Sequence, residues 1–345
     1  MSGIAVSSAV MAYGLIIFGS QVRVSDSGMG CPDWPLCEGK LGPLQEFHAL
    51  MEQTHRYLAA MVTVLVLTTA MLAWRNRSRS AAIRPALFTV AVIVVQIGLG
   101  ALTVIAGNGA PTVAAHLLAA LAMLAGATIT AVAALVPLRP TTGRRLGRLG
   151  WTAISAAGVL FVSGSLVVNA EAEKACASFP LCPSDQPGGM VALHLIHRAV
   201  AVLAGTALLT FAVHAWRHWS VPSGTRALAA ALVALVVATA SLGIVSALLK
   251  APPGWQDLHL AGAAAVLAVS MALAALGWLT GANSRPRSRT SSGPGSRSAT
   301  EATLVRTALP RRSPSAESDW AARAAWRPNL RPSARIPSSA CVWKR

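Results

Sequence analysis

Apolar residues along this chain fall into eight long runs, and the short segments between the runs carry most of the charge. The runs occupy residues 3–22, 48–74, 85–105, 112–136, 151–170, 190–216, 227–249 and 255–280. Each run has about 20 residues or more, which is the length that an α-helix needs to cross a bilayer. The pattern therefore predicts an all-α polytopic membrane protein with eight transmembrane helices.

The composition agrees with this prediction. Hydrophobic residues make up 54% of the 345 residues and charged residues only 12%, which excludes an ordinary soluble domain. The first run has neither a basic start nor a small-residue cleavage site. We therefore expect it to be a retained helix and not a signal peptide.

Much of the formal net charge of +17 lies in residues 281–345, which hold 13 Lys and Arg and three acids. This segment is rich in Ser, Pro and Arg and lacks apolar periodicity, so we predict a disordered basic tail. The tail could contact anionic lipid headgroups or be a solvated extension without a specific role. We expect no nucleic-acid partner, and we expect Cys341 to be a free thiol.

Every second loop between the apolar runs is rich in arginine. The arginines concerned are Arg75, Arg77, Arg79, Arg84, Arg139, Arg144, Arg145, Arg148, Arg217 and Arg226. Because positively charged loops stay in the cytoplasm, both termini are predicted to be cytoplasmic, in a bacterial-type cell membrane. The nine acids before residue 281 lie on the opposite side or just inside the helices that begin there.

Two cysteine pairs with the same spacing, in CPDWPLC (31–37) and CASFPLC (176–182), lie in loops that this topology places outside. Disulfides persist in that oxidising compartment. A five-residue spacer closes a small ring easily. We therefore predict one disulfide between Cys31 and Cys37 and another between Cys176 and Cys182.

A fixed offset of 142–145 residues relates the two halves of the chain well beyond the cysteines. EQTHRYLAA (52–60) corresponds to HLIHRAVAV (194–202), and LGALTV (99–104) corresponds to LGIVSA (242–247). The offset predicts two tandem, pseudo-symmetric four-helix bundles. The expected boundaries are 1–138 for the first repeat, 139–150 for a cytoplasmic linker, 151–280 for the second repeat and 281–345 for the tail.

Four histidines recur at this offset, a turn or two inside the outer ends of the even-numbered runs: His55, His116, His197 and His259. Ionisable groups inside a membrane are costly and tend to be functional. Two imidazoles facing each other across a bundle suit the axial positions of a haem iron, whereas zinc would need further ligands at the same point. Arg56 and Arg198 directly follow two of these histidines and could bind haem propionates or extend to the headgroups.

The halves differ one helical turn before the first histidine. Glu52 lies three residues before His55, on the same helix face, and His194 stands at the equivalent position of the second half. A carboxylate beside a haem pocket is a candidate for proton transfer. The alternative is that Glu52 lies at the wet outer end and only helps to start the helix.

Several motifs together, SGMGCPDWPLCEGKLGP, EQTHR, LGALTV and AAHLLAA, strongly resemble the haem A synthase family over about residues 10–280. The CPDWPLC loop followed by E-x-x-H-R is the most specific part of the resemblance. It implies an oxidoreductase acting on CH or CH2 groups, which oxidises the C8 methyl group of haem O to a formyl group by successive hydroxylations. The product, haem A, serves terminal oxidases.

The resemblance also implies a division of labour between the halves. His55 and His116 would flank the substrate haem O, and His197 and His259 would ligate the iron of a haem b cofactor. Expected partners are haem O and membrane lipid. Further candidates are haem O synthase, terminal oxidase assembly factors and a second copy of the chain.

The remaining roles follow from the same resemblance. Glu52 would be the catalytic carboxylate, and Cys31 with Cys37 would be the functionally important outer pair. Cys176 with Cys182 would be a structural disulfide.

Three other classes of protein compete with this interpretation. A dihaem electron-transfer cytochrome would place its haems at different depths, whereas all four histidines lie near one face. An outer-face thiol oxidoreductase would leave the four histidines unexplained. A repeat-built transporter would have helices broken by Pro or Gly at the membrane centre, and the sequence indicates none.

Overall fold

The computed structural model describes residues 1–42, 45–136, 144–182, 187–218 and 224–280. The predicted tail 281–345 with Cys341, and residues 139–143 of the predicted linker, lie outside this range. The long helices are α1 (Ser2–Val24), α2 (Phe47–Arg75), α3 (Ile83–Ile105), α4 (Ala110–Leu135), α5 (Arg144–Asn169), α6 (Gly188–His218), α7 (Gly224–Leu248) and α8 (Pro253–Thr280). Two short 3-10 helices, η1 (Arg77–Ala82) and η2 (Ala172–Lys174), lie in loops.

All eight long helices are long and apolar enough to cross a membrane. The predicted all-α fold with eight membrane-spanning helices is therefore confirmed, and the chain is a multi-pass membrane protein. Helix α5 begins at Arg144, inside the range predicted as a linker, and its apolar span begins at Leu149.

Local chemistry explains how these helices begin and end. Pro253 is the first residue of α8, and Pro111 lies in the first turn of α4, where the fixed φ of proline suits a helix start. Helices α3 and α7 are each followed by two left-handed residues, Gly107 and Asn108 after α3 and Lys250 and Ala251 after α7, with φ between 54° and 62°. A left-handed residue ends a helix and turns the chain back, so α4 and α8 return antiparallel to their predecessors.

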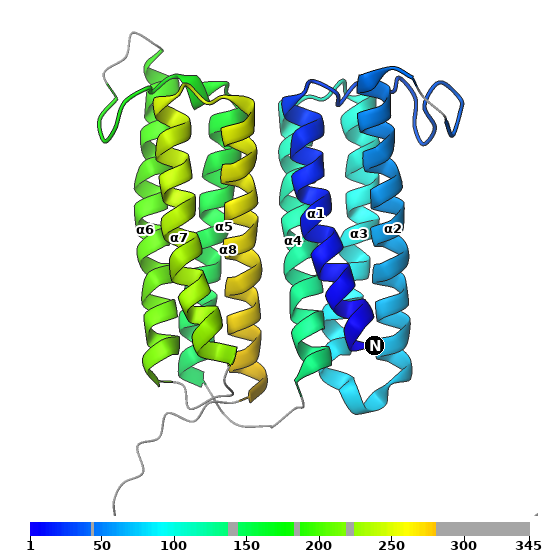
Figure 1. Ribbon diagram of the computed structural model, residues 1–345, viewed down its shortest axis with the longest axis vertical. Coiled ribbons are helices and arrows are strands. Elements are labelled where there is room, and N and C mark those ends of the chain that lie inside the picture. The colour runs from blue at the N-terminus through cyan, green and yellow to red at the C-terminus, as the bar shows by residue number, and fades with distance from the viewer. Residues whose placement is uncertain (43–44, 137–143, 183–186, 219–223, 281–345) are drawn as a thin grey trace, which may run out of the picture. The chain divides into compact units, whose positions relative to one another are not determined.

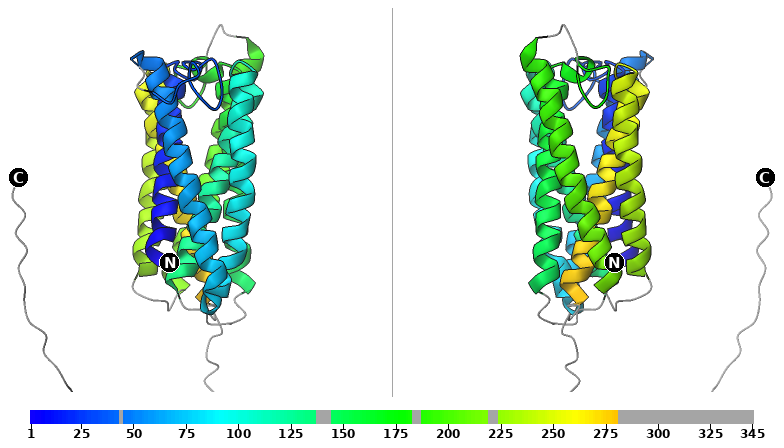
Figure 2. Two further views of the ribbon diagram at one scale, coloured as in Figure 1. Left: turned by 90° about the vertical axis from the view of Figure 1, so that its right-hand side faces the viewer. Right: turned by 90° about the vertical axis from the view of Figure 1, so that its left-hand side faces the viewer.

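The helices of each half form a closed ring of neighbours (Figures 1 and 2). In the first half α1 packs on α2 and α4, and α3 packs on α2 and α4; in the second half α5 to α8 pack in the same order. Helix α4 is the most deeply buried span, and it also contacts α8. Small residues such as Ala120, Gly126 and Ala127 let its backbone approach its neighbours closely.

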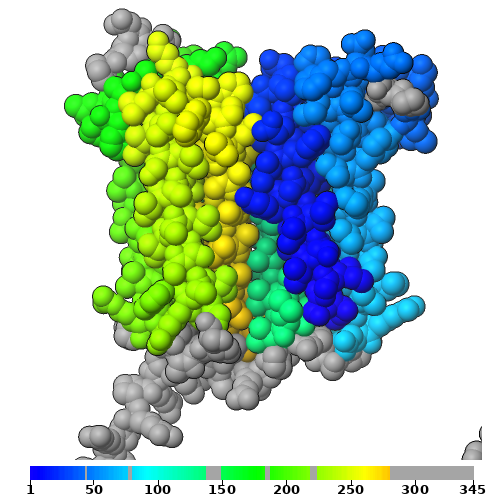
Figure 3. All heavy atoms as spheres, in the orientation of Figure 1, coloured from blue at the N-terminus to red at the C-terminus, as the bar shows by residue number. Residues whose placement is uncertain are grey.

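Polar side chains as well as apolar ones join α1 of the first half to α8 of the second. The Tyr13 hydroxyl donates to the Ala261 carbonyl at 3.1 Å, while Ser20 and Gln21 both donate to the Asp257 carboxylate. Figure 3 shows the surface of α1 directly against that of α8. These bonds satisfy a carboxylate that is only 5% exposed within the apolar junction.

Both disulfide loops lie at the same end of the helices, and the N-terminus lies at the other end (Figure 1). Each half has four membrane-spanning helices, which is an even number, so both halves begin on the same side of the membrane. The loop after the first helix of each half therefore lies on the same side in both. The two loops are therefore placed for equivalent roles beside the histidines near that end.

Candidate functional site

Each of the four predicted histidine ligands lies against a glycine of the preceding helix. The pairs are Gly19 with His55, Gly100 with His116, Gly164 with His197, and Gly243 with His259. A Cβ atom on these glycines would stand 2.7–3.2 Å from the Cε1 atom of the ring. The missing side chain is what allows each imidazole to lie against the neighbouring backbone.

In the second half, both imidazoles donate their Nδ1 proton to a fixed acceptor. The main-chain oxygen of Thr239, which can only accept, lies 3.0 Å from His259 Nδ1. Ser163 donates its hydroxyl proton to the Leu160 carbonyl, so its Oγ accepts from His197 Nδ1 at 2.9 Å. Each ring therefore keeps its lone pair on Nε2, where a metal can bind.

In the first half, the imidazoles lack this support. His55 stacks on Phe18 with ring centroids 6.3 Å apart, and Phe18 stands where the second half has Ser163. His116 accepts a hydrogen bond at Nε2 from the Gln96 amide at 3.2 Å. The Nδ1 atoms of both rings are buried without a hydrogen-bond partner in the described part of the chain. The two histidine pairs therefore differ in how firmly their rings are held.

The donor set fits a haem better than a bare metal ion. Among the residues that the structure describes, no three His, Cys, Asp or Glu side chains converge as a protein-only metal site would require. Within each half, the two imidazoles belong to apolar helices of the same four-helix ring, and each lies against a glycine of the preceding helix. A haem iron needs only these two axial nitrogens, because the macrocycle supplies its other ligands.

Glu52 joins helix α2 to the first disulfide loop. Its side chain is buried, and its Oε2 accepts the backbone N–H of Cys31 at 2.8 Å. Its Oε1 accepts from the Arg56 guanidinium at 2.5 Å. The carboxylate thus lies one turn before His55, as the spacing predicts. It is hydrogen-bonded to the backbone N–H of Cys31 in the loop.

Arg56 and Arg198 each attach the disulfide loop of their own half to the following helix. Arg56 donates to the Leu36 carbonyl at 2.5 Å, and Arg198 donates to the carbonyls of Pro180 at 2.8 Å and Cys176 at 3.3 Å. Their observed partners are therefore loop carbonyls, together with the Glu52 carboxylate for Arg56. Contact with haem propionates stays a prediction.

The cysteines pair as the sequence predicts. Cys31 bonds to Cys37 and Cys176 bonds to Cys182, with Cα atoms 4.8 Å and 5.1 Å apart. The sulfur-bearing side chains of Cys31 and Cys37 are fully buried with Ala49 of α2. The first loop is therefore packed against the helix that carries Glu52.

A short turn inside the first loop is held by Asp33. Its carboxylate oxygens accept the backbone N–H groups of Gly39 at 2.8 Å and Glu38 at 2.6 Å. These hydrogen bonds, that from Gly39 above all, lower the pKa of the Asp33 carboxyl below its ordinary value of 3.8. The charged form of Asp33 therefore stabilises the turn.

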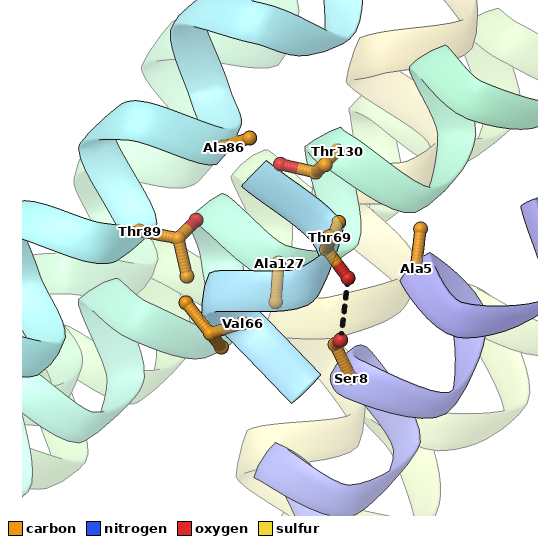
Figure 4. Close-up of a pocket in the computed structure, with 8 residues that line it drawn as sticks. All are labelled: Ala5, Ser8, Val66, Thr69, Ala86, Thr89, Ala127 and Thr130. Atoms are coloured by element: carbon orange, nitrogen blue, oxygen red, sulfur yellow. Dashed lines mark hydrogen bonds between the residues drawn. The ribbon is translucent and has the colours of Figure 1, made fainter. Parts of the chain in front are cut away.

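Towards the opposite end, the first half contains a small cavity lined by four hydroxyl-bearing side chains and four small apolar ones (Figure 4). Ser8, Thr69, Thr89 and Thr130 line it from α1 to α4, and Ser8 lies 2.9 Å from Thr69. At the repeat offset, the second half has Ala153, Phe211, Leu232 and Leu273, which belong to one buried apolar cluster. At these four positions the first bundle therefore has smaller and more polar side chains than the second.

Eight membrane-spanning helices with two glycine-backed imidazole pairs near one end define a multi-pass membrane protein suited to haem. The chain belongs to the COX15–CtaA family of cytochrome oxidase assembly proteins, whose family model matches residues 2–271. The predicted family relationship is thereby confirmed.

Individual relatives agree with this family. A protein of Bacillus pumilus named Heme A synthase is 28% identical over 223 residues, which cover 59% of this chain and 71% of that protein. A Heme A synthase of Alkalihalophilus pseudofirmus is 28% identical over 247 residues, or 66% and 82% of the two chains. A shorter match, 28% over 111 residues, joins 32% of this chain to 24% of a Protoheme IX farnesyltransferase of Halobacterium salinarum.

Sequence reasoning missed the partners of the histidines. Ser163, Thr239 and Gln96 contact the rings from neighbouring helices, and none of them belongs to a recognisable motif. The repeat offset contains the signal. It aligns Gln96 with Thr239 and Phe18 with Ser163, so the two halves have different residues at these positions although the surrounding segments correspond.

Proposed function

We propose that this protein is a haem A synthase, an oxidoreductase that converts the C8 methyl group of haem O into a formyl group. Family membership and the relatives named Heme A synthase support the reaction. The structural observation that carries the proposal is the contrast between the two histidine pairs, since an enzyme that acts on one haem with the help of another needs two different sites.

The second half suits a resident haem b on His197 and His259. Both rings already donate through Nδ1, which fixes the tautomer and makes Nε2 a stronger ligand. The closely packed apolar core below them, which includes Phe211, supports a rigid site. Haem b, when bound, supplies an acceptor that takes electrons one at a time.

The first half suits a haem that enters and leaves. His55 and His116 would flank haem O, and neither ring has a fixed partner on Nδ1 in the described residues. Weakly held rings bind iron less tightly, which is appropriate for a substrate that is exchanged in each turnover.

The reaction needs a group that takes up protons. Converting a methyl group and one water into a formyl group releases four protons and four electrons. Glu52 is the proposed proton acceptor, because it lies one turn from His55 in the same half. Each of its oxygens accepts one hydrogen bond and retains a second lone pair for a proton. Arg56 and the N–H of Cys31 hold the carboxylate in place meanwhile.

The proposed setting is the cell membrane of a bacterium, with both termini in the cytoplasm and both disulfide loops outside. We assign residues 1–138 to the substrate repeat, 139–150 to a linker, 151–280 to the pseudo-symmetric haem b repeat and 281–345 to a basic tail. A haem O synthase is the proposed supplier of the substrate. Terminal oxidase assembly factors are the proposed recipients of the product.

The direct test is expression in a host that makes haem O but no haem A, followed by pigment extraction and chromatography. We expect haem A in cells with the wild-type chain and none with His55→Ala, while haem b remains bound in both. Haem b without any haem A in the wild type would contradict the proposal and favour an electron-transfer cytochrome.

A further inference from the structure

Gln96 of α3 contacts Nε2 of His116 on α4, which is the atom that would bind a haem iron. The Gln96 amide nitrogen lies 3.2 Å from His116 Nε2. An amide nitrogen only donates, so the ring must accept with its Nε2 lone pair and carry its proton on Nδ1. That Nδ1 atom and Gln96 Oε1 are both buried without a hydrogen-bond partner in the described segments.

The second half differs in the side chain at this position. Thr239 replaces Gln96 at the repeat offset, and it contacts His259 through a main-chain oxygen that accepts from Nδ1. This bond leaves the Nε2 lone pair of His259 free. The two halves thus differ at Nε2, because among the described residues a side chain lies against this atom of His116, while the contact to His259 is at Nδ1.

We infer that Gln96 is a displaceable partner of His116, which keeps the bond between His116 Nε2 and the iron of haem O exchangeable. This inference rests on the proposed function. One lone pair cannot both accept a hydrogen bond and coordinate iron. Binding of haem O at His116 therefore breaks the bond from Gln96. When the product leaves, the iron–nitrogen bond breaks as the hydrogen bond forms again.

This competition lowers the affinity of the first site for any haem and leaves the second site unchanged. The hydrogen bond to Gln96 accounts for a change in binding of roughly 2- to 10-fold. A change of that size in the release rate matters at a site that must empty after every turnover. It would be a disadvantage at a site that retains a cofactor.

The test measures release of haem from the purified full-length protein, isolated from a host that makes haem O. An excess of apomyoglobin serves as the acceptor, and the haem O plus haem A that remains is extracted and quantified over time. We expect Gln96→Leu to slow their loss roughly 2- to 10-fold. We expect Gln96→Asn, whose shorter amide does not span the distance, to do the same. The haem b spectrum should be unchanged in both variants.

Thr89→Val is the matched control. Thr89 lies on the same helix about 10 Å from Gln96 and donates only to the Pro85 carbonyl, so its replacement should leave the release rate unaltered. Faster haem release from both Gln96 variants would show that Gln96 strengthens the binding of haem by His116. An unchanged release rate would show that Gln96 has no influence on haem exchange. Either result overturns the inference while wild-type haem A formation stands. Absence of haem A from the wild type overturns the proposed function and the inference together.

Discussion

Gly243 on α7 lies so close to His259 on α8 that a Cβ atom there would stand 2.7 Å from the Cε1 atom of the ring. Real carbon atoms do not approach that closely, so Gly243→Ala must move the imidazole or separate the helices. Overpacking of this kind costs about 1–3 kcal/mol. We expect the affinity for haem b to fall roughly 5- to 150-fold, measured as haem b per protein in the reduced-minus-oxidised spectrum.

A glycine elsewhere in the same bundle provides the control for this change. Gly158 of α5 has no atom within 4 Å of its Cβ position, and alanine favours a helix over glycine. Gly158→Ala should therefore keep the full haem b content. Equal losses in the two variants would mean that glycine in these helices serves packing in general and not the histidine.

The hydrogen bond from His197 to Ser163 should contribute to haem b affinity. Ser163→Ala removes the acceptor of the Nδ1 proton and leaves the imidazole itself in place. Loss of such a supporting partner typically lowers metal affinity about 10- to 100-fold. Titration of the haem-depleted protein with haem b measures the effect. Phe18→Ala, at the equivalent position of the first half, should leave haem b affinity unchanged.

The sequence predicts some of this site well and other parts poorly, for physical reasons. Helix length and apolarity are local properties, so the sequence predicts the eight spans, and the repeat offset pairs His55 with His197 and His116 with His259. The partners of a ring depend on how neighbouring helices rotate against each other. Ser163 is 34 residues from His197, and nothing in its local sequence indicates the contact. The bond from Cys31 to Glu52 likewise depends on how the loop folds back onto α2.

Acid should loosen the first disulfide loop through Asp33. Its pKa is lowered in the folded loop, so the charged form stabilises the turn above its ordinary value of 3.8, and the effect is lost as the pH falls through the folded pKa. Hydrogen exchange of the 31–40 segment, corrected for the intrinsic rate, should show less protection at pH 3 than at pH 6. Asp33→Asn should show low protection at both values, and a wild type that stays equally protected would contradict this role.

The bonds of Glu52 to the loop should slow reduction of the nearer disulfide. In Glu52→Ala the N–H of Cys31 loses its buried acceptor, so the loop should open more often. We expect Cys31–Cys37 to be reduced several-fold faster than in the wild type, measured by thiol labelling and mass spectrometry. Cys176–Cys182 provides the internal control, because no bond to Glu52 reaches it. Equal acceleration of both pairs would indicate general loosening of the protein.

Glu52→Gln separates the charge of this residue from its role in holding the loop. Glutamine has nearly the same shape, and its carbonyl oxygen can still accept from either Cys31 or Arg56, so the loop should remain attached. An amide cannot take up a proton at physiological pH. The variant should therefore accumulate normally, retain haem b and resist reduction of Cys31–Cys37 better than Glu52→Ala does. It should nevertheless fail to make haem A and should retain haem O or an intermediate with a hydroxymethyl group, identified by chromatography. Normal haem A formation in Glu52→Gln together with loss in Glu52→Ala would assign Glu52 to loop positioning alone, and the proton acceptor would have to be another group.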